Sequence, residues 1–533
     1  MKQINHAIFL ALYLASVGSA KKFYDDDPLF QEPQPIDASQ ALPRKLSDYY
    51  DLFLHTLSKP GERETRHHAM PAQGVNTLGE PMDGAWYTHR HYFERMSIEQ
   101  LVRGPGGDCP PEGRWTVVSA KSEGVTPGFT ILDEKKRRYF LKFDPQAYPE
   151  MATAAEVISA RFFHALGYHV ADEYIVYFTP DSLKLGEKVM LADKTGKKRP
   201  MSQHDLVEIL HKAPKDRQGR YRAVASLQIP GKPLGPFRYF GTRKDDPNDT
   251  TRHEHRRDLR GLAIFSAWLN HDDSRAINTF DALQEENGVN YIKHYLLDFG
   301  ATLGSSTSRA NSPRAGGEYL FGWKQSALQV ATLGLAVPRW ALAKYEVYPA
   351  VGRIEADVFN PEKWTPEYPN PAFLNRLPED EFWAAKQVMA FTDEEIRAVV
   401  KSGQISDPAA ETYLADVLIK RRDKIGKAFL PKVLPLDRFR VRDGRLEFDD
   451  LAERHGLGKT EVRAVWFAFD NDTEERTPLA GEKRLYLPAE ILAAREGYWV
   501  AQLDDGQAPA KKANVYLRKK GQQVEVVRVE RSR

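Results

Sequence analysis

The sequence predicts an α+β protein in which a strand-rich region is followed by a helical region and then by a β-rich tail. Runs typical of strands recur between Trp115 and Ile229. Patterns with the helical period, several of them with recognisable caps, dominate between Arg252 and Ile425. From about residue 436 apolar and polar residues alternate, which is the pattern of strands with one buried face.

Length and composition are those of an ordinary soluble protein with several domains. The chain has 533 residues, of which 41% are hydrophobic and 28% are charged, enough for two to four domains with their own cores. The net charge of +2 gives no argument for nucleic acid or an anionic membrane as a partner. We therefore expect no nucleic-acid partner.

The N-terminus has the order of a secretory signal peptide, which we place at residues 1–20. Lys2 precedes an apolar stretch from Ala7 to Val17, and the small residues Gly18, Ser19 and Ala20 follow. The alternative is an apolar N-terminal strand or helix of the fold. No other run reaches about eighteen apolar residues, so we expect no transmembrane segment in the mature chain.

A single cysteine, Cys109, rules out an intramolecular disulfide. That is unremarkable in a bacterial periplasmic protein and unusual in a eukaryotic secreted one. Together with the signal peptide, this favours a bacterial protein exported to the periplasm or beyond the cell.

Residues 21–110 are rich in proline, aspartate and turn formers, with short helical patches at Leu46–Leu57 and Ser97–Val102. We expect this stretch to be an extension that packs on the neighbouring catalytic domain and has no core of its own. The Trp86–Arg90 segment is apolar enough to dock there.

The strand-rich region should contain five strands and one helix. The expected strands are Trp115–Ala120, Phe129–Leu132, Tyr139–Phe143, Tyr174–Phe178 and Val224–Ile229, and the helix is Ala152–Leu166. Residues 181–220 look like an insertion with a hairpin turning at Lys194–Gly196. A short helix in it is capped by Ser202, with Asp205 three residues later.

The next region should be mainly helical, after a hinge at Pro230–Pro233. Its expected helices are Arg252–Leu269, Glu379–Phe391, Asp393–Ser402 and Ala409–Ile425, with Thr392 and Glu395 forming a capping box. Two short strands, Thr279–Leu283 and Tyr291–Leu297, should turn at Glu286–Gly288, and residues 305–375 should be irregular.

Four groups of residues, in a fixed order, carry the chemistry. Lys142 lies in a strand, Glu156 in the following helix, Asp273 and Asn278 five positions apart in a loop, and Asp298-Phe299-Gly300 at the end of a strand. Each motif alone is weak. In this order and structural context they form the set of parts needed for kinase-type phosphoryl transfer.

Each side chain suits one task in that reaction, which requires a triphosphate to be held straight and neutralised. Oxygens of Asp298 and Asn278 can hold Mg²⁺. Asp273 can orient the attacking hydroxyl or accept its proton, Lys142 can contact the α- and β-phosphates, and Glu156 can fix Lys142 by pairing with it. Asp144 and Glu150 compete with Glu156 for this pairing, and Asp272 competes with Asp273; these alternatives stay open at this point.

Residues from about 115 to 304, roughly a third of the chain, resemble the atypical protein-kinase-like superfamily. They look closer to HipA-like, CotH-like and secretory-pathway kinases than to the ordinary eukaryotic type, on the strength of the Lys142, Glu156, Asp273, Asn278 and Asp298 motifs. The resemblance implies a bilobal fold that binds ATP with Mg²⁺ or Mn²⁺ between its lobes. The N-lobe would be residues 111–235, with the insertion 181–220, and the C-lobe 236–435; residues 436–533 would be a small β-rich domain.

Three departures from the kinase pattern matter. There is no G-x-G-x-x-G motif; in the loop Ser119–Gly128 the phosphates would be held by backbone N–H groups with Ser122, Gly124, Thr126 and Gly128. His271-Asp272-Asp273 replaces His-Arg-Asp. No Ala-Pro-Glu follows Gly300, which puts the usual peptide-binding segment in doubt.

The expected activity is that of an exported, Mg²⁺-dependent kinase that transfers the γ-phosphoryl group of ATP to a protein or small-molecule hydroxyl. The periplasm offers little ATP, and this motivates two alternatives. One is a catalytically silent kinase-like scaffold that binds a partner. The other is an AMP transferase on the same fold.

Overall fold

The computed structural model describes residues 21–58, 70–107, 109–121, 128–192, 198–333, 335–480, 484–507 and 511–532. The chain forms two compact units. The smaller unit combines residues up to Phe30, Val75–Glu80 and Pro431–Arg533, and the larger one combines Gln31–Gly74 with Pro81–Leu430. The predicted signal peptide lies outside the described residues. Among the helices described, none is long and apolar enough to cross a membrane.

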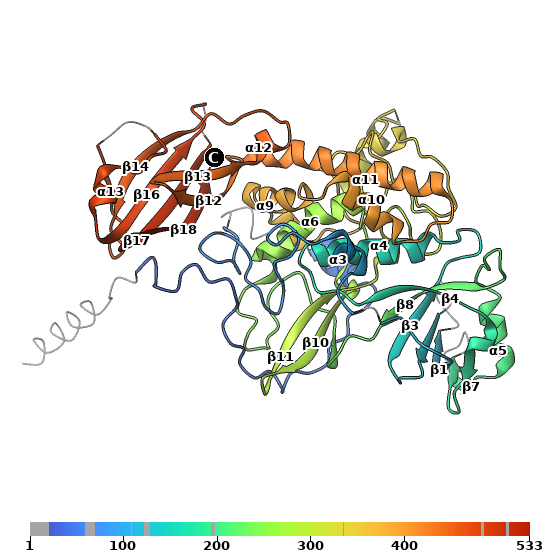
Figure 1. Cartoon of the computed structure of the whole chain (residues 1–533). Helices are drawn as coiled ribbons and strands as arrows, with labels where there is room; N and C mark the ends of the chain where they lie inside the picture. Colours follow the sequence, from blue (N-terminus) through green and yellow to red (C-terminus); the bar gives the residue numbers. More distant parts are fainter. Residues whose placement is uncertain are drawn as a thin grey trace, which may run out of the picture. The chain divides into compact units, whose positions relative to one another are not determined.

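The larger unit contains a six-stranded sheet with the strand order β4-β8-β3-β2-β1-β5 (Figure 1). Its strands are β1 Trp115–Lys121, β2 Gly128–Leu132, β3 Arg138–Phe143, β4 Glu173–Phe178, β5 Leu183–Leu185 and β8 Tyr221–Leu227. Five of the six strands were predicted, with bounds that differ by a few residues; β5 was not predicted. The strand pairs of this sheet are antiparallel except for β1–β5, which is parallel. The last predicted strand ends at Leu227, so that Gln228 and Ile229 lie beyond the sheet.

The alternation of β3 explains how this sheet supports Lys142. Tyr139, Leu141 and Phe143 are buried in the core, while Phe140 and Lys142 point to the opposite face. Lys142 lies opposite Gly128 of β2 and Val224 of β8. A side chain at Gly128 would place its Cβ 2.7 Å from the carbonyl oxygen of Leu141, so only glycine lets β2 and β3 approach here.

Helix α4 (Met151–Ala165) follows strand β3 and carries Glu156. We predicted that one apolar face of this helix would be buried, but in the structure every residue of α4 except Arg161 is buried. The reason is that α4 packs against β4 and β8, against the short turn η5 (Phe299–Ala301), and against helices α3 (Ile98–Arg103) and α10 (Asp393–Lys401). Burial on all sides fixes the position of Glu156 firmly.

The insertion adds a small hairpin and a helix. Its strands β6 (Met190–Ala192) and β7 (Lys198–Pro200) pair antiparallel, and the predicted turn between them lies outside the described residues. Helix α5 (Gln203–Leu210) starts as predicted: Ser202 and Asp205 form a reciprocal capping box.

The predicted hinge at Pro230–Pro233 is partly wrong. Strand β9 (Lys232–Gly235) forms the edge of a three-stranded sheet with β10 (Thr279–Glu286) and β11 (Val289–Leu296). Proline is tolerated because β9 has a neighbour on one side only. The β10–β11 hairpin turns at Asn287 and Gly288 as predicted, with positive φ at both residues.

The remainder of the larger unit is mainly helical. Its helices are α6 Arg257–Leu269, α7 Trp323–Ala331, α8 Pro371–Leu374, α9 Pro378–Val388, α10 and α11 Pro408–Phe429. The α6 helix starts later than predicted, because a 3₁₀ turn at His253–His255 precedes it. The predicted capping box of Thr392 and Glu395 is confirmed. Residues 305–375 are largely irregular, as expected, apart from α7, α8 and a 3₁₀ turn at Arg339–Leu342.

The N-terminal stretch contributes to both units. Phe23 is buried in the smaller unit against Phe469 and Tyr516. Trp86 belongs to the larger unit, where it is buried and stacks on His294 with ring centroids 3.5 Å apart.

The smaller unit is β-rich, as the alternating pattern predicted. A five-stranded antiparallel sheet with the order β15-β14-β16-β17-β18 is joined by the hairpin β12–β13. The strands are β12 Leu436–Arg442, β13 Arg445–Asp450, β14 Arg463–Phe469, β15 Arg476–Pro478, β16 Glu496–Asp504, β17 Lys512–Lys520 and β18 Gln523–Ser532.

Candidate active site

Lys142 is the centre of the candidate site. Its Nζ lies 3.1 Å from Oε2 of Glu156 and 2.9 Å from Oδ1 of Asp298. Three segments far apart in the sequence therefore meet: strand β3, helix α4 and the end of β11. Burial by itself would lower the pKa of Lys142, but the carboxylates of Glu156 and Asp298 outweigh it and raise the pKa, so the side chain is a firmly held cation.

The competing partners of Lys142 are engaged elsewhere. Asp144 accepts hydrogen bonds from the backbone N–H and the hydroxyl of Thr153, at 2.9 and 2.6 Å. Glu150 accepts one from the backbone N–H of Ser406 at 2.8 Å. Among the three acidic residues considered, only Glu156 pairs with Lys142 in the structure.

Glu156 also ties the helix to the Asp298-Phe299-Gly300 motif. Its Oε1 accepts a hydrogen bond from the backbone N–H of Phe299 at 3.1 Å. A Cβ at Gly300 would lie 3.1 Å from Oε2, so the glycine leaves room for this carboxylate. Burial raises the pKa of Glu156, against the opposing effect of Lys142.

Asp298 takes an unusual backbone conformation. Its φ of 62° and ψ of 58° lie in the left-handed region, which aspartate tolerates better than most residues. The next residue, Phe299, is buried and stacks on Phe163 of α4, with ring centroids 4.9 Å apart. The buried ring anchors the motif, while half of the Asp298 side-chain surface stays exposed (50%). Strained backbone beside an exposed carboxylate is typical of binding sites.

The loop after α6 brings Asp273 and Asn278 together. The side-chain nitrogen of Asn278 donates to Oδ2 of Asp273 at 2.9 Å and to its backbone oxygen at 2.8 Å. Burial raises the pKa of Asp273 to about 7; Arg275 opposes this shift, and Glu367 adds to it. Oδ1 of Asp273 has no hydrogen-bond partner among the described residues, and its nearest cation is Arg275 at 3.7 Å.

Asp272 is less suited to a chemical role than Asp273. Both its carboxylate oxygens accept hydrogen bonds from the side-chain nitrogen of Asn311, at 3.0 and 3.1 Å, and its side chain is buried. Its backbone oxygen accepts from Glu367. Asp273, the aspartate indicated by the five-residue spacing to Asn278, is thus the one whose Oδ1 has no hydrogen-bond partner among the described residues.

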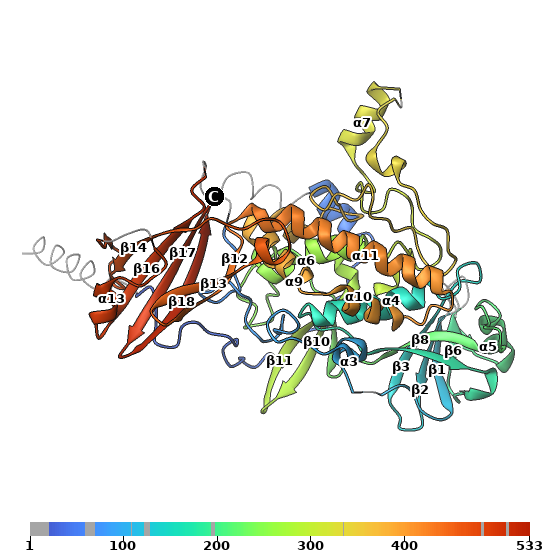
Figure 2. The same cartoon turned by 45° about the horizontal axis from the view of Figure 1, so that its top comes forward.

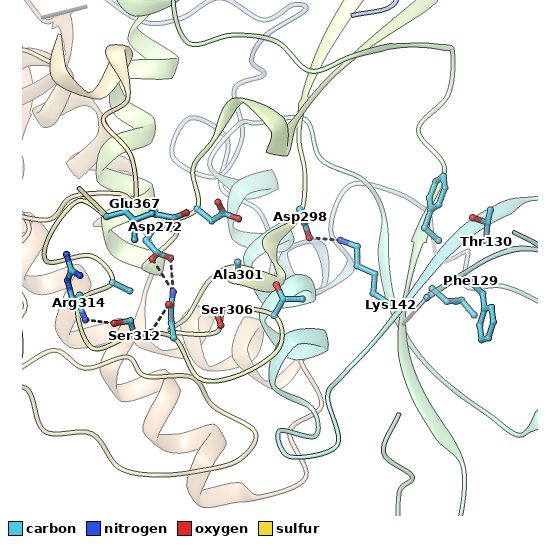
Figure 3. Close-up of a pocket in the computed structure, with 18 of the residues that line it drawn as sticks. Phe129, Thr130, Lys142, Asp272, Asp298, Ala301, Ser306, Ser312, Arg314 and Glu367 are labelled. Carbon is cyan, nitrogen blue, oxygen red and sulfur yellow. Dashed lines mark hydrogen bonds and ion pairs between the residues drawn. The ribbon is translucent and has the colours of Figure 1, made fainter. Parts of the chain in front are cut away.

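Two cavities meet at Lys142 and Asp298. The large cavity, of about 770 Å³, lies between β1–β3 and the loops that carry Asp273, Asn311 and Glu367. Figure 3 shows Lys142 reaching from β3 to Asp298, with Asp272, Glu367 and Arg314 farther along this cavity. Gly128 lines it as well; the other predicted phosphate-binding residues, Ser122, Gly124 and Thr126, lie outside the described residues.

The inner cavity, of about 600 Å³, is mostly apolar. Its lining includes Ala171, Leu227, Ile229, Ile277 and Leu297, with Asn278, Lys142 and Asp298 at one side. This size and lining are typical of pockets for a small organic ligand.

Glu173 is a site residue that the sequence analysis missed. It lines the inner cavity, is buried, and accepts a hydrogen bond from the hydroxyl of Ser226 at 2.5 Å. Burial and the neighbouring Glu156 raise its pKa to about 8. No sequence signal marks a glutamate at the start of an apolar strand as a cavity residue. Asn311, Arg314 and Glu367 were missed because they lie in the irregular stretch.

The donor set fits a divalent cation bound together with phosphates. Asp298 and Asn278 both line the inner cavity, and because the nitrogen of Asn278 is taken by Asp273, its oxygen is the atom left for a cation. Lys142 is the cation on which the carboxylates of Glu156, Asp298 and Glu173 act. No group of three or more His, Cys, Asp or Glu side chains among the described residues could hold a metal ion alone. Two protein oxygens completed by phosphates and water are usual for Mg²⁺.

Comparisons with known proteins give only loose similarity. No family model matches the chain, and no curated protein does. Among solved structures, the chain is similar to a Golgi casein kinase at 10% identity and a TM-score of 0.28, covering 75% of this chain and 95% of that one. A Golgi casein kinase with Mn/ADP bound matches at 10% identity and a TM-score of 0.25, covering 60% of this chain and 75% of the other.

Proposed function

We propose that the chain is an exported, atypical kinase-like phosphotransferase that transfers the γ-phosphoryl group of ATP to a hydroxyl. The observation that carries the proposal is the Lys142–Glu156–Asp298 cluster, with distances of 3.1 and 2.9 Å, at the junction of two cavities. The three residues follow the order of kinase motifs along the chain, and they also lie together in space. A lysine in a strand pairs with a glutamate in a helix, next to the aspartate of an Asp-Phe-Gly motif.

The nucleotide would lie across both cavities. The apolar lining of the inner cavity suits a nucleobase, whose edge could bond to the carbonyl oxygen of Gln228 and the backbone of Ile229; the N–H of Gln228 already donates to the carbonyl oxygen of Arg138. The triphosphate would then pass Lys142 into the large cavity. Lys142, held by Glu156, would donate hydrogen bonds to the α- and β-phosphates.

The metal would bind at Asp298 and Asn278. A divalent cation, Mg²⁺ or Mn²⁺, supplies charge neutralisation on the phosphates when it is held by these two oxygens. Asn278 is positioned for this by its hydrogen bond to Asp273. The surplus of carboxylates around Lys142 provides the negative potential that attracts such an ion.

Asp273 would act on the acceptor. Its unpartnered Oδ1 and its pKa of about 7 suit a group that orients a hydroxyl and takes its proton near neutral pH. The acceptor would enter the large cavity, which reaches from Asp273 to Arg314 and Glu367. We place the enzyme outside the cytoplasm because of the signal-like residues 1–20.

Nucleotide-binding calorimetry with and without metal tests the proposal. We expect ATP to bind in Mg²⁺ or Mn²⁺ and to lose its binding in EDTA, because the phosphates lack a sufficient set of protein cations. Mass spectrometry of the chain after incubation would then separate phosphate from AMP transfer. Equal ATP binding in EDTA would overturn the metal assignment. Metal-dependent binding with no transfer to any acceptor would leave the scaffold alternative.

A further inference from the structure

An exposed apolar loop, Leu320–Val347, stands out on the surface of the larger unit. Nine of the 23 large hydrophobic side chains that are exposed among the described residues lie in it. The most exposed are Leu333 at 91%, Val347 at 90% and Leu335 at 84%. In Figure 2 its helix α7 stands clear of α10 and α11. Soluble monomers rarely expose such a concentration of apolar surface without a partner for it.

Basic residues outnumber acidic ones in the loop Leu320–Val347, where Glu346 is the one acidic residue of the sequence. From Tyr319 to Tyr345 the sequence contains Lys324, Arg339 and Lys344 but no aspartate or glutamate, and it contains two tryptophans. The whole chain, by contrast, has 76 basic and 74 acidic residues. The loop therefore combines exposed apolar side chains with a small excess of basic residues, although the chain as a whole is almost neutral. Leucine, valine and tryptophan combined with lysine and arginine are typical of segments that lie in the interface of an anionic bilayer.

A second exposed apolar stripe lies in the same unit. Tyr49, Phe53 and Leu57 are about 60% exposed and four residues apart, so that they share one face of the turns around Leu52–Ser58. Arg275 lies beside this segment: its Nε lies 3.8 Å from Asp51, and its guanidinium lies 5.0 Å from the ring centroid of Tyr368, in the stretch that follows the loop.

The start of the loop borders the large cavity. Leu320 lines that cavity together with Glu367, and its backbone N–H donates to the carbonyl oxygen of Glu367 at 2.8 Å. Glu367 directly precedes Tyr368, which contacts Arg275. Leu320, which is 42% exposed, is thus an apolar side chain of the loop at the border of this cavity.

We propose that the loop Leu320–Val347, assisted by the Tyr49–Leu57 stripe, docks this unit on an anionic lipid bilayer. Helix α7 has nine residues, too few to span a membrane, so the loop would lie in the interface plane. Leu328 and Val337 line a cavity of about 300 Å³ between the loop and residues 355–364, whereas the most exposed side chains, Leu333 and Leu335, are not part of its lining. A symmetric contact with a second copy would bring the same positive charges together, which disfavours a dimer.

Vesicle flotation of the purified chain tests the proposal by binding alone, independently of phosphoryl transfer. We expect binding to vesicles of phosphatidylcholine mixed with phosphatidylglycerol and weaker binding to phosphatidylcholine alone. L333D/L335D should weaken binding at least tenfold, since it places two charges in the apolar interface. R339Q/K344Q should weaken binding to the anionic vesicles about tenfold and change binding to neutral vesicles little.

The matched control is Y486D/L492D, which charges two side chains of the smaller unit that are 60% and 55% exposed. This variant should bind vesicles like the parent, and circular dichroism should show all variants folded. Failure of the parent chain to bind anionic vesicles would overturn the proposal. So would unchanged binding by L333D/L335D, or a dimer that L333D/L335D dissociates in a chain that does not bind vesicles.

Discussion

Two clusters in the larger unit pair carboxylates with cations, and they differ in how completely the charges are matched. In the closed cluster, Asp281 lies between Arg243 at 2.8 Å and His294 at 2.7 Å, and none of the three side chains is more than 3% exposed. In the open cluster, Lys142 pairs with Glu156 and Asp298, but Lys142 is 35% and Asp298 50% exposed.

The pKa shifts of the carboxylates reflect this difference. Burial favours the protonated form of Asp281, yet His294 and Arg243 outweigh it and hold its pKa below the usual value. In the open cluster burial dominates, and the pKa values of Glu156 and Glu173 are raised. A closed cluster is satisfied by the protein itself. In the open cluster half of the Asp298 side chain stays accessible, so that a cation and its ligand can reach the carboxylate.

The largest effect should come from removing the carboxylate of the open cluster. We expect Asp298→Asn to lower phosphoryl transfer by about 10³-fold or more, because the metal loses its charged ligand. The fold should survive, since asparagine tolerates the left-handed backbone and the side chain is half exposed. Steady-state turnover and the melting temperature measure the two effects. A fully active variant would contradict the metal assignment.

The same substitution in the closed cluster should act on stability. Asp281→Asn leaves Arg243 without its buried partner, and we expect a loss of roughly 3–5 kcal/mol in the free energy of unfolding. Nucleotide affinity per folded molecule should stay unchanged. Urea unfolding and calorimetry at a temperature where the variant is folded would measure both. If Asp281→Asn removed nucleotide binding without lowering stability, the contrast between the clusters would be wrong.

The smallest effect concerns pH and Glu173. Between its ordinary pKa of 4.5 and its raised pKa of about 8, the folded chain keeps a proton that the unfolded chain loses, so this residue makes stability fall as pH rises through that window. Glu173→Gln removes this dependence and keeps an acceptor for Ser226. Its stability relative to the parent should rise by about 1.4 kcal/mol or more between pH 5 and pH 8. Urea unfolding of both proteins at both pH values measures this difference. The prediction would be wrong if the free energy of unfolding of the variant and that of the parent changed equally between the two pH values.

Much of the fold could be predicted from the sequence because its signals are local. Alternation along Tyr139–Phe143 fixes which face Lys142 takes, and the Ser202 and Thr392 capping boxes fix where helices begin. Strand β9 was missed because the prolines and glycine of Pro230–Pro233 predict a turn. Residues Lys232–Gly235 form a strand because they pair with β10. The full burial of α4 also escaped prediction, since burial depends on how many elements surround a helix.

By itself the sequence determined the order of the chemical groups: a lysine in a strand, a glutamate in a helix, an Asp-x4-Asn loop and an Asp-Phe-Gly turn. The tertiary structure alone decided that Glu156, not Asp144 or Glu150, pairs with Lys142, and that Glu173 and Glu367 line the same cavities. It also decided which apolar residues remain on the surface near them. The physical reason is that ion pairs and burial depend on which groups lie within a few ångströms in space. Sequence patterns, by contrast, specify only the local conformation of the chain.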